Sequence, residues 1–313
     1  MQYSQGAVDI IIPTYKPDTK FVRLIELLES QSRVVRNIYI INTEKGIWDS
    51  CPDAINVCMR FGNIEVTHIG FDEFDHGGTR LRAAQRSDAE FFIMMTQDAI
   101  PSDNNLVETL IDTLEQDTDI AVAYARQLPS SGTSETEKYI RKFNYPEQSI
   151  TKSVNDIERM GIKTFFCSNV CAAYRHDTFD KLGGFVTKTI FNEDMIYAAK
   201  AIKAGAKIAY VADARVYHSH NYGCMEQFHR NFDLAVSQAN HPEVFSGLKS
   251  ESEGMRLVKD MAAHLKKVHK LYLFPGFAIN CAFRLLGFKL GHNYKKLPKT
   301  VVLKFTSNKS YWK

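Results

Sequence analysis

The sequence predicts an α/β protein with a doubly wound, mostly parallel sheet and a helical C-terminal extension. Short runs rich in Val, Ile and Phe alternate with segments in which apolar residues recur at helical spacing, and strands separated by such helices are typical of parallel sheets. Polar residues follow several of these runs, at the strand ends where ligands of such sheets bind. Residues 261–313 carry eleven Lys and Arg and no Asp or Glu, which sets the extension apart.

The first β-α-β unit occupies residues 8–43. The run VDIIIPTY (8–15) has the composition of a buried parallel strand. Asp18 can cap a helix over 21–28, where the apolar residues recur at helical spacing. The segment RNIYIINT (36–43) returns to a strand pattern.

The alternation continues through the next two hundred residues or so. Residues 129–160 interrupt this alternation, because they are rich in Ser, Thr, Glu and Lys. Their composition predicts a long loop with one short helix. A loop of that length is often functional. The other expected elements are strands at 64–69, 90–97, 120–127 and 206–218, a further apolar run at 164–174, and helices from about Thr79, over Asn105–Gln116, from Asn192, over Met225–Ala239 and over 253–270.

The composition is that of a globular protein, with 44% hydrophobic and 24% charged residues, so neither a disordered nor a fibrous chain is expected. The six cysteines include no Cys-x-x-Cys pair, and no secretory signal precedes them. Both observations argue against a zinc knuckle and a disulfide framework and indicate reduced thiols in the cytosol.

Charge is divided unevenly along the chain. Residues 1–260 contain 28 basic and 36 acidic residues and are therefore acidic, whereas the tail, 261–313, is basic. The two parts together give the net charge of +3. Such a tail suits an anionic partner, either nucleic acid or a phospholipid surface, and is also compatible with a solvated basic face. The chain carries no recognisable nucleic-acid recognition motif, so the membrane surface is the partner we expect.

The most apolar part of the tail is LYLFPGFAINCAFRLLGFKLG (271–291), which Pro275, Arg284 and Lys289 interrupt. A membrane-spanning helix needs about twenty mostly uncharged residues. The interruptions therefore favour an amphipathic helix that lies in the membrane interface. A homodimer interface would also explain the apolar residues.

Side chains with metal-binding chemistry follow two of the predicted strands. Asp98 comes directly after the strand at 90–97, and hard cations such as Mg²⁺ and Mn²⁺ are held through carboxylates and phosphate oxygens. His218 and His220 end the strand at 206–218 and would project the same way if that strand continues. Each group alone is compatible with a structural role, but their convergence favours a metal site.

The segment FDHGGTR (74–80) places two glycines and an arginine at the start of a helix. Backbone amides freed by Gly77 and Gly78, together with the fork of Arg80, can bind phosphate. A simple turn and helix cap would also account for the segment. It matches neither a Walker loop nor a G-x-G-x-x-G fingerprint, so adenylate and dinucleotide sites are not indicated.

Asn192, Glu193 and Asp194 open another helix. Asn192 can cap that helix, and acids in a first turn interact favourably with the helix dipole. Alternatively, one of the two carboxylates is a base at the mouth of the helix. The three residues taken alone favour the structural role.

Five motifs follow one another along the chain: PTYK (13–16), DHGGTR (75–80), TQDAIP (96–101), NED (192–194) and YHSHNY (217–222). They occur in the order found in family-2 glycosyltransferases, and the chain resembles the bacterial rhamnosyltransferases of that family, which build cell-wall and O-antigen polysaccharides. The resemblance covers nearly the whole chain, including GFKLGHNYKKLP (287–298) and a terminal Tyr-Trp pair.

The resemblance implies a GT-A fold, a Mn²⁺ or Mg²⁺ ion and an inverting single displacement. Asp194, beside Glu193 in the family's Glu-Asp pair, would be the general base. Asp98 would be the last acid of the Asp-x-Asp metal motif, with His218 or His220 as a histidine ligand. The implied donor-binding residues are Pro13, Thr14, Tyr15, Asn42, Gly77, Gly78, Arg80, Gln97 and Arg230, and Gln227 matches another polar position of the family.

Two positions depart from the family's pattern. Thr96 stands where the first acid of Asp-x-Asp occurs, which would weaken metal binding and make a histidine ligand more important. Asn42 and Thr43 stand where many members carry an Asp that holds the nucleobase.

The resemblance further implies transfer of L-rhamnose from dTDP-β-L-rhamnose to a hydroxyl of a lipid-linked saccharide, at the inner face of the cell membrane. UDP-galactose, UDP-glucose and UDP-N-acetylhexosamine remain alternative donors, and a catalytically inactive, membrane-associated binding subunit is an alternative of another class. We expect a catalytic domain over 1–245, with a donor half (about 1–128) and an acceptor half (about 160–245), and a basic amphipathic helical region over 246–313.

Overall fold

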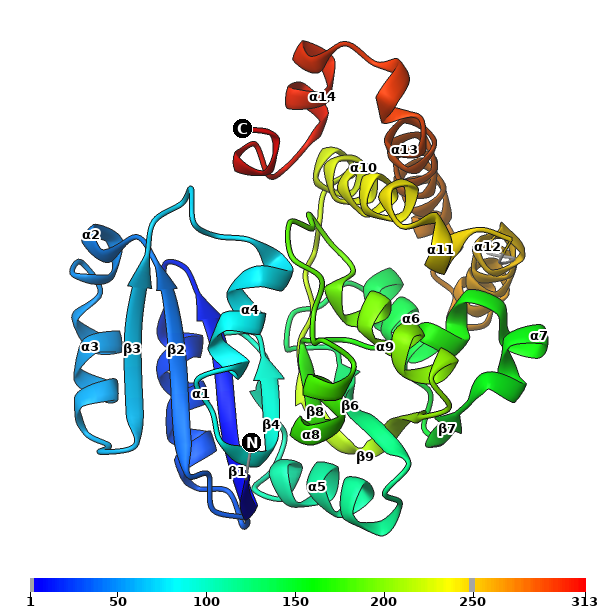
Figure 1. The fold of residues 1–313 in the computed structure, drawn as a ribbon. Coiled ribbons are helices and arrows are strands. Elements are labelled where there is room, and N and C mark those ends of the chain that lie inside the picture. The colour runs from blue at the N-terminus through cyan, green and yellow to red at the C-terminus, as the bar shows by residue number, and fades with distance from the viewer. Residues whose placement is uncertain (1–2, 248–250) are drawn as a thin grey trace.

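A computed structural model describes residues 3–247 and 251–313, and it contains a mixed, mostly parallel sheet of nine strands (Figure 1). The order is β3-β2-β1-β4-β8-β6-β9-β5, with β7 paired to β9 off this path. The strands are β1 (Ser4–Thr14), β2 (Asn37–Thr43), β3 (Ile64–Ile69), β4 (Ala89–Met95), β5 (Ile100–Pro101), β6 (Ile120–Leu128), β7 (Ile150–Lys152), β8 (Cys171–Arg175) and β9 (Lys207–Tyr217).

The long strands run in one direction, and only β8 and the short strands β5 and β7 are antiparallel to their neighbours. The carboxyl ends of β1, β4, β6 and β9 therefore meet at one edge of the sheet. This confirms the predicted doubly wound, mostly parallel sheet, into which β8 is inserted between β4 and β6.

Helices cover both faces of the sheet, because residues along each strand alternate between two cores. Ile10 and Ile12 of β1 pack with α1, α3 and α5, whereas Ile11 packs with α4, α8 and α9. Asp18 caps α1 as predicted, and its carboxylate accepts from the Lys20 and Phe21 amides. The helices of the body are α1 (Thr19–Glu29), α2 (Lys45–Trp48), α3 (Pro52–Met59), α4 (His76–Ala84), α5 (Leu106–Gln116), α6 (Glu135–Asn144), α7 (Ile157–Met160), α8 (His176–Lys181) and α9 (Glu193–Lys203).

Two segments differ from the predictions. The polar segment 129–160 holds α6, β7 and α7 rather than one short helix in a loop. The apolar run 164–174 begins as a 3₁₀ turn, and only its end forms β8. All six cysteines are free thiols, as predicted.

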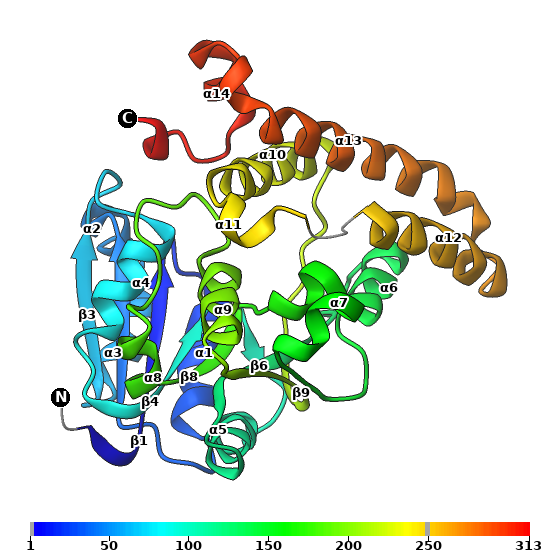
Figure 2. The same cartoon turned by 45° about the vertical axis from the view of Figure 1, so that its right-hand side comes forward.

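The C-terminal extension is helical, as predicted, and lies across the carboxyl ends of the strands (Figures 1 and 2). α13 packs closely on α10: a Cβ atom added at Gly287 would lie 2.3 Å from the Phe228 carbonyl oxygen, and one at Gly291 would lie 2.2 Å from that of Phe232. Larger residues at these glycines would separate the two helices. The helices of the extension are α12 (Glu251–Lys267), α13 (Phe274–His292) and α14 (Lys299–Phe305), and α10 (Cys224–Asn240) and α11 (Pro242–Phe245) precede it.

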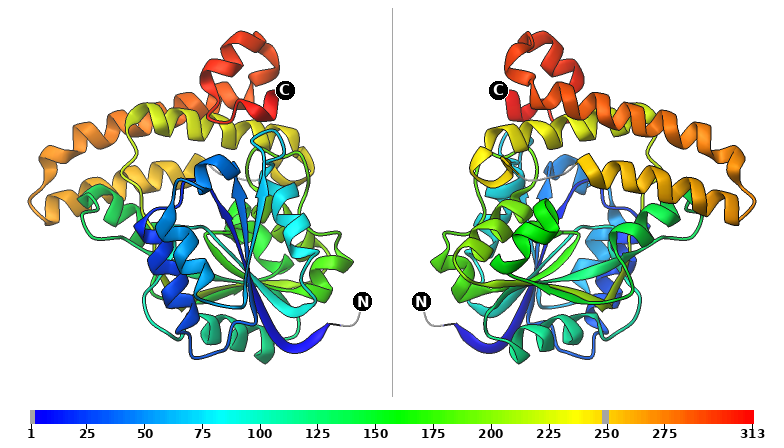
Figure 3. Two further views of the ribbon diagram at one scale, coloured as in Figure 1. Left: turned by 90° about the vertical axis from the view of Figure 1, so that its left-hand side faces the viewer. Right: turned by 90° about the vertical axis from the view of Figure 1, so that its right-hand side faces the viewer.

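α12 and α13 lie side by side and overhang the body (Figure 3). A small core that includes Ile140 of α6, Met261 of α12 and Phe277 of α13 joins them to the body, and Lys270 pairs with Glu135 at 2.8 Å. Within the described residues, one segment, Leu271–His292, is long and apolar enough by length and composition to cross a membrane, with a mean hydropathy of 1.4.

Candidate active site

A cavity of about 680 Å³ lies at the carboxyl ends of β1 and β4, between the body and the extension. Six of the predicted donor-binding residues, Pro13, Thr14, Tyr15, Arg80, Gln97 and Arg230, line it. Other residues that line it are Thr43, Phe71, Phe74, His76, Thr96, Ile190, Phe191, Tyr222, Glu226, His229, Asp233, Ser307, Asn308 and Ser310.

The end of β1 is tied to the end of β4 by a reciprocal pair of hydrogen bonds. The Tyr15 amide donates to Gln97 Oε1, and Gln97 Nε2 donates to the Tyr15 carbonyl oxygen, both at 2.8 Å. The Tyr15 ring meets the Phe71 ring edge to face with centroids 5.3 Å apart, and both rings are exposed. This part of the cavity therefore offers aromatic faces to a planar ligand.

Two arginines bring positive charge to the cavity. Arg80 of α4 is buried and lies 3.4 Å from the Glu193 carboxylate. The Arg230 guanidinium of α10 lies over the rings of Phe191 and Tyr222, at 4.8 and 5.6 Å from their centroids, and makes no ion pair among the residues that the structure describes. Its fork remains available to bind a phosphate.

Gly77 and Gly78 serve a different purpose from the phosphate binding that we predicted. The Gly78 amide donates to Asp75 Oδ2 at 2.7 Å, so it is already satisfied. A Cβ atom at Gly77 would lie 1.7 Å from the Val186 carbonyl oxygen. Asp75 also accepts from the amides of Lys188 and Thr189, at 2.8 and 3.0 Å. Gly77 therefore lets α4 dock closely against the loop that leads to α9, and Gly78 leaves room for the Asp75 carboxylate that binds the amides of that loop.

Asn42, also predicted to contact the donor, is fully buried and does not line the cavity. Its amide nitrogen contacts His68 Nδ1 at 3.0 Å and donates to the Glu44 carbonyl oxygen. Its neighbour Thr43 lines the cavity instead. Residues alternate sides along an extended strand, which is why the two neighbours differ.

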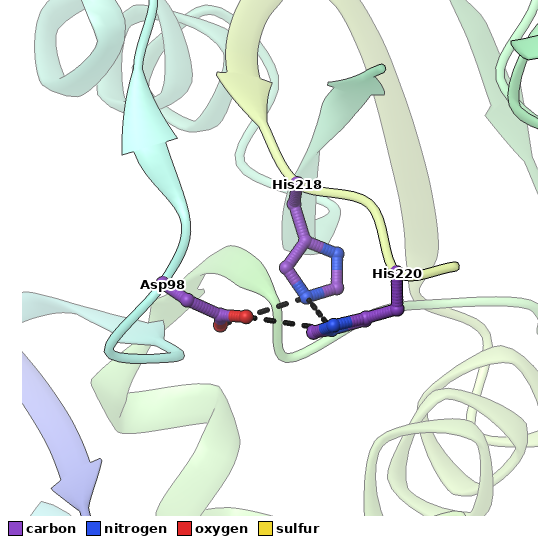
Figure 4. Close-up of side chains that lie close together, drawn as sticks. All are labelled: Asp98, His218 and His220. Carbon is purple, nitrogen blue, oxygen red and sulfur yellow. Dashed lines mark hydrogen bonds and ion pairs between the residues drawn. The ribbon is translucent and has the colours of Figure 1, made fainter. Parts of the chain in front are cut away.

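Asp98, His218 and His220 converge as predicted from their places after β4 and β9 (Figure 4). The Nε2 atoms of His218 and His220 lie 3.6 and 3.4 Å from the Asp98 carboxylate and 3.0 Å from one another. One ligand atom from each residue lies within 4.8 Å of the others. One carboxylate oxygen and two imidazole nitrogens are a donor set that suits a divalent transition-metal ion.

Gln127 at the end of β6 fixes the tautomer of His218. His218 Nδ1 donates to Gln127 Oε1 at 2.9 Å, which leaves the Nε2 lone pair directed at Asp98 and His220. Gln127 is itself held by hydrogen bonds from its amide to Tyr145 and Ser168. Burial lowers the pKa of His218 to about 3, so the ring is neutral near pH 7, the form that binds metals.

We expect His218→Ala to weaken activation by Mn²⁺ more than His220→Ala does, by about tenfold or more. His218 is buried and oriented by Gln127, whereas His220 is partly exposed and stacks on Tyr222. Activity titrated with Mn²⁺ measures the effect. The control variant His241→Ala removes an imidazole that pairs with Glu243 and should leave activation by Mn²⁺ unchanged. Wild-type activation in both cluster variants would remove histidine from the metal site.

Glu193 and Asp194 begin α9 and have different surroundings. Buried Glu193 lies beside Arg80 and accepts from Asn169 Nδ2 at 3.1 Å. Asp194 is half-buried and accepts two backbone hydrogen bonds, from Asn169 at 3.0 Å and from Met195 at 2.8 Å. Asn169 therefore positions both carboxylates. The Tyr174 hydroxyl orients Asn169 by donating to its Oδ1 at 2.6 Å.

The two carboxylates have opposite pKa shifts. Burial and the neighbouring Glu193 charge raise the pKa of Asp194 to about 7. Burial acts on Glu193 in the same direction, but Arg80 and His76 outweigh it and hold the Glu193 pKa below its ordinary value. A carboxylate that titrates near neutral pH suits general base catalysis, and this property distinguishes Asp194 from its neighbour.

No pattern in the sequence indicated that the end of the chain reaches the cavity. Ser307, Asn308 and Ser310 line it, and Asp233 of α10 fixes this segment by accepting from Thr306 Oγ1 at 2.6 Å and from the Ser307 amide at 2.8 Å. Gln127 and Asn169 were not predicted as site residues either. They are neutral residues in ordinary strand and loop positions, so no motif marks them.

Comparison with known proteins identifies the family of this chain. The Glycosyl transferase family 2 model matches residues 9–183. The O-antigen chain rhamnosyltransferases RfbN of Salmonella typhimurium and WbaN of Salmonella anatum are each 37% identical over 97% of this chain and over 96% and 95% of their own lengths.

Solved structures share the fold. The mannosyltransferase PcManGT from Pyrobaculum calidifontis, in complex with GDP-Man and Mn²⁺, has a TM-score of 0.63 at 11% identity over 93% of this chain and 88% of its own. S. aureus TarS in complex with UDP-GlcNAc has a TM-score of 0.52 at 14% identity, over 93% and 91%. With its matched family model, its full-length relatives and a sheet of this architecture, the chain belongs to glycosyl transferase family 2.

Proposed function

We propose that this enzyme is an inverting rhamnosyltransferase that moves L-rhamnose from dTDP-β-L-rhamnose to a lipid-linked saccharide in the synthesis of an O-antigen or a related surface polysaccharide. The observation that carries the proposal is the 37% identity to two O-antigen chain rhamnosyltransferases over nearly the full chain. The site supports it: aromatic rings and arginines line the cavity, the candidate metal cluster follows β4 and β9, and Asp194, whose pKa is raised to about 7, lies in the first turn of α9.

The cluster of Asp98, His218 and His220 would hold a divalent cation. Two imidazoles favour Mn²⁺ over Mg²⁺, which prefers oxygen ligands. When bound, the ion supplies positive charge that stabilises the leaving diphosphate.

The residues of the chain perform the other steps. Arg230, and Arg80 deeper in the cavity, would attract the diphosphate, while Tyr15 and Phe71 offer faces for the thymine base. Asp194 would accept the proton of the acceptor hydroxyl as its oxygen attacks the anomeric carbon. The bond to the diphosphate breaks on the opposite side, so a β-linked donor gives an α-linked product.

A donor panel tests the proposed function. The purified enzyme is mixed with a saccharide acceptor and dTDP-β-L-rhamnose, UDP-galactose, UDP-glucose or UDP-N-acetylhexosamine, and products are identified by mass spectrometry. We expect transfer from dTDP-rhamnose alone. Transfer from a UDP sugar instead would replace the donor assignment, and neither transfer nor donor hydrolysis with any donor would favour the inactive binding subunit.

We also propose that residues 246–313 attach the enzyme to the inner face of the membrane. α13 presents an exposed apolar face, on which Ile279 is 55% and Leu286 is 51% exposed. The tail that surrounds this face is basic and contains no acid after residue 260. This combination is typical of helices that lie in an anionic membrane interface.

We expect Ile279→Ser with Leu286→Ser to reduce binding to anionic vesicles while donor hydrolysis stays intact, because both side chains point away from α10 and the cavities. Co-sedimentation with phosphatidylglycerol vesicles at low salt measures the effect. Met59→Ser, which removes a 79% exposed apolar side chain from α3, is the control. If wild type did not sediment and its mass rose with concentration, the face would be a dimer interface instead.

A further inference from the structure

A second cavity, of about 250 Å³, lies beside the metal-site cluster. α6, the loop that carries His220 and Tyr222, and α13 form its walls. Tyr222 lines both cavities, and His220 belongs to the metal-site cluster and to the wall of this second cavity. Its volume is below the usual range for drug-sized ligands and suits a small group such as a phosphate or diphosphate.

The wall formed by α13 contributes one positive charge, that of Arg284. Arg284 Nε donates to Asn280 Oδ1 at 3.0 Å, and the guanidinium makes no ion pair among the described residues. Burial lowers the pKa of Arg284, yet a guanidinium stays charged in proteins. A part-buried cation that lacks a carboxylate partner is a ready site for an anion.

The other charged group that lines this cavity is already paired. Glu137 of α6 lies 2.8 Å from Arg141 Nε, one turn along the same helix. Its negative charge is therefore offset by Arg141, and no ion pair joins it to Arg284 among the described residues.

The surroundings of Arg284 also indicate what the anion is attached to. Leu273 and Phe277 line the same cavity, and the exposed apolar residues Leu271 and Tyr272 lie in the 3₁₀ turn that leads into α13. An anion bound at Arg284 thus has the metal-site cluster on one side and an apolar helix surface on the other. A sugar, a phosphate and a lipid joined in that order would match these three surfaces.

We propose that the second cavity binds the phosphate or diphosphate that joins the acceptor saccharide to its lipid, with Arg284 as the anion contact. The inference rests on the proposed function, since it concerns the acceptor of the same reaction. It assigns to α13 a role in acceptor binding in addition to membrane attachment.

Arg284→Gln tests the assignment. Initial rates are measured in neutral detergent micelles, without anionic lipid, on two acceptors with the same saccharide: one linked to a polyprenyl diphosphate and one linked to an uncharged alkyl chain. We expect the KM for the diphosphate acceptor to rise about tenfold or more. The KM for the alkyl glycoside and the KM for the donor should not change, and Arg284→Lys should restore part of the loss.

Lys138→Gln is the matched control, because Lys138 is an exposed cation on α6 that does not line the cavity. It should leave both acceptor KM values unchanged. Equal KM values for wild type and Arg284→Gln on the diphosphate acceptor would overturn the proposal, as would an equal rise on both acceptors. If Arg284→Gln lowered only the binding of phosphatidylglycerol vesicles, the anion would be a membrane headgroup and the acceptor assignment would be wrong.

These outcomes are separate from a failure of the proposed function. Wild-type transfer of rhamnose to the alkyl glycoside would support rhamnosyl transfer even if Arg284 had no effect. Absence of transfer to either acceptor by the wild-type enzyme would instead contradict the proposed function itself.

Discussion

Replacing Asp194 by Asn is expected to lower turnover about a hundredfold or more while donor binding stays nearly intact. An acceptor hydroxyl is a poor nucleophile near neutral pH, and Asn cannot accept its proton. Asn keeps the size of the side chain and an oxygen that can accept from the Asn169 or Met195 amide. Turnover and the donor KM, measured with saturating acceptor, separate a catalytic loss from a binding loss.

The pKa of Asp194 predicts how the rate depends on pH. A base must be deprotonated to act, and the Asp194 pKa is raised to about 7. Turnover should therefore be low in acid, rise through about pH 7 and level off above it. Asp194→Asn should lose this rise, leaving a low rate that does not respond to pH in that range.

The Glu193→Gln variant tests the role of the neighbouring carboxylate. The Glu193 charge contributes to the raised pKa of Asp194, so its removal should lower that pKa and move the rise in turnover to more acidic pH. The variant also removes the carboxylate beside buried Arg80 and should be less stable, so rates must be measured below its unfolding transition. If Glu193→Gln abolished turnover and Asp194→Asn did not, the base would be Glu193; if both stayed active, the two acids would only stabilise the start of α9.

Much of the fold followed from local pattern. The strands β1, β2, β3 and β9 and the helices α1 and α5 lie within a few residues of the predicted ranges, because buried parallel strands and amphipathic helices have distinct periods. The order of the strands in the sheet could not be predicted from local patterns. β8 enters between β4 and β6 through pairings between residues about fifty to eighty positions apart, for which a single sequence holds no signal.

The convergence of the candidate metal cluster could be predicted, because its three residues follow strand ends. Asp98, His218 and His220 were found this way, because parallel strands bring their carboxyl ends to one edge. Gly77 and Gly78 could not be assigned in this way: flexible glycines at a helix start fit phosphate binding and tight packing equally well. Here the Val186 backbone occupies the space beside Gly77, and the Asp75 carboxylate the space beside Gly78. The contribution of Ser307 and Asn308 depends on the path of the whole extension, which no local pattern encodes.

Replacing Asp98 by Asn is expected to weaken Mn²⁺ binding and to lower activity about a hundredfold or more, since the cluster would lose its anionic ligand. Thr96 stands two residues earlier and offers no second carboxylate, and its hydroxyl is buried without a hydrogen-bond partner among the described residues. Asp98 is consequently the single carboxylate of the three-residue cluster. The two neutral imidazoles that would remain are a weaker site for a divalent cation.

The decisive measurement is binding rather than rate. Calorimetry with dTDP should show that Mn²⁺ tightens nucleotide binding to the wild-type enzyme and fails to do so in Asp98→Asn, while the weak binding in the presence of EDTA is the same for both. Asp103→Asn is the matched control, because Asp103 lies at the same edge of the sheet and pairs with Arg215 at 3.1 Å, outside the cluster. If Asp98→Asn retained both the metal effect on nucleotide binding and its activity, Asp98 would be only a residue of the turn between β4 and β5.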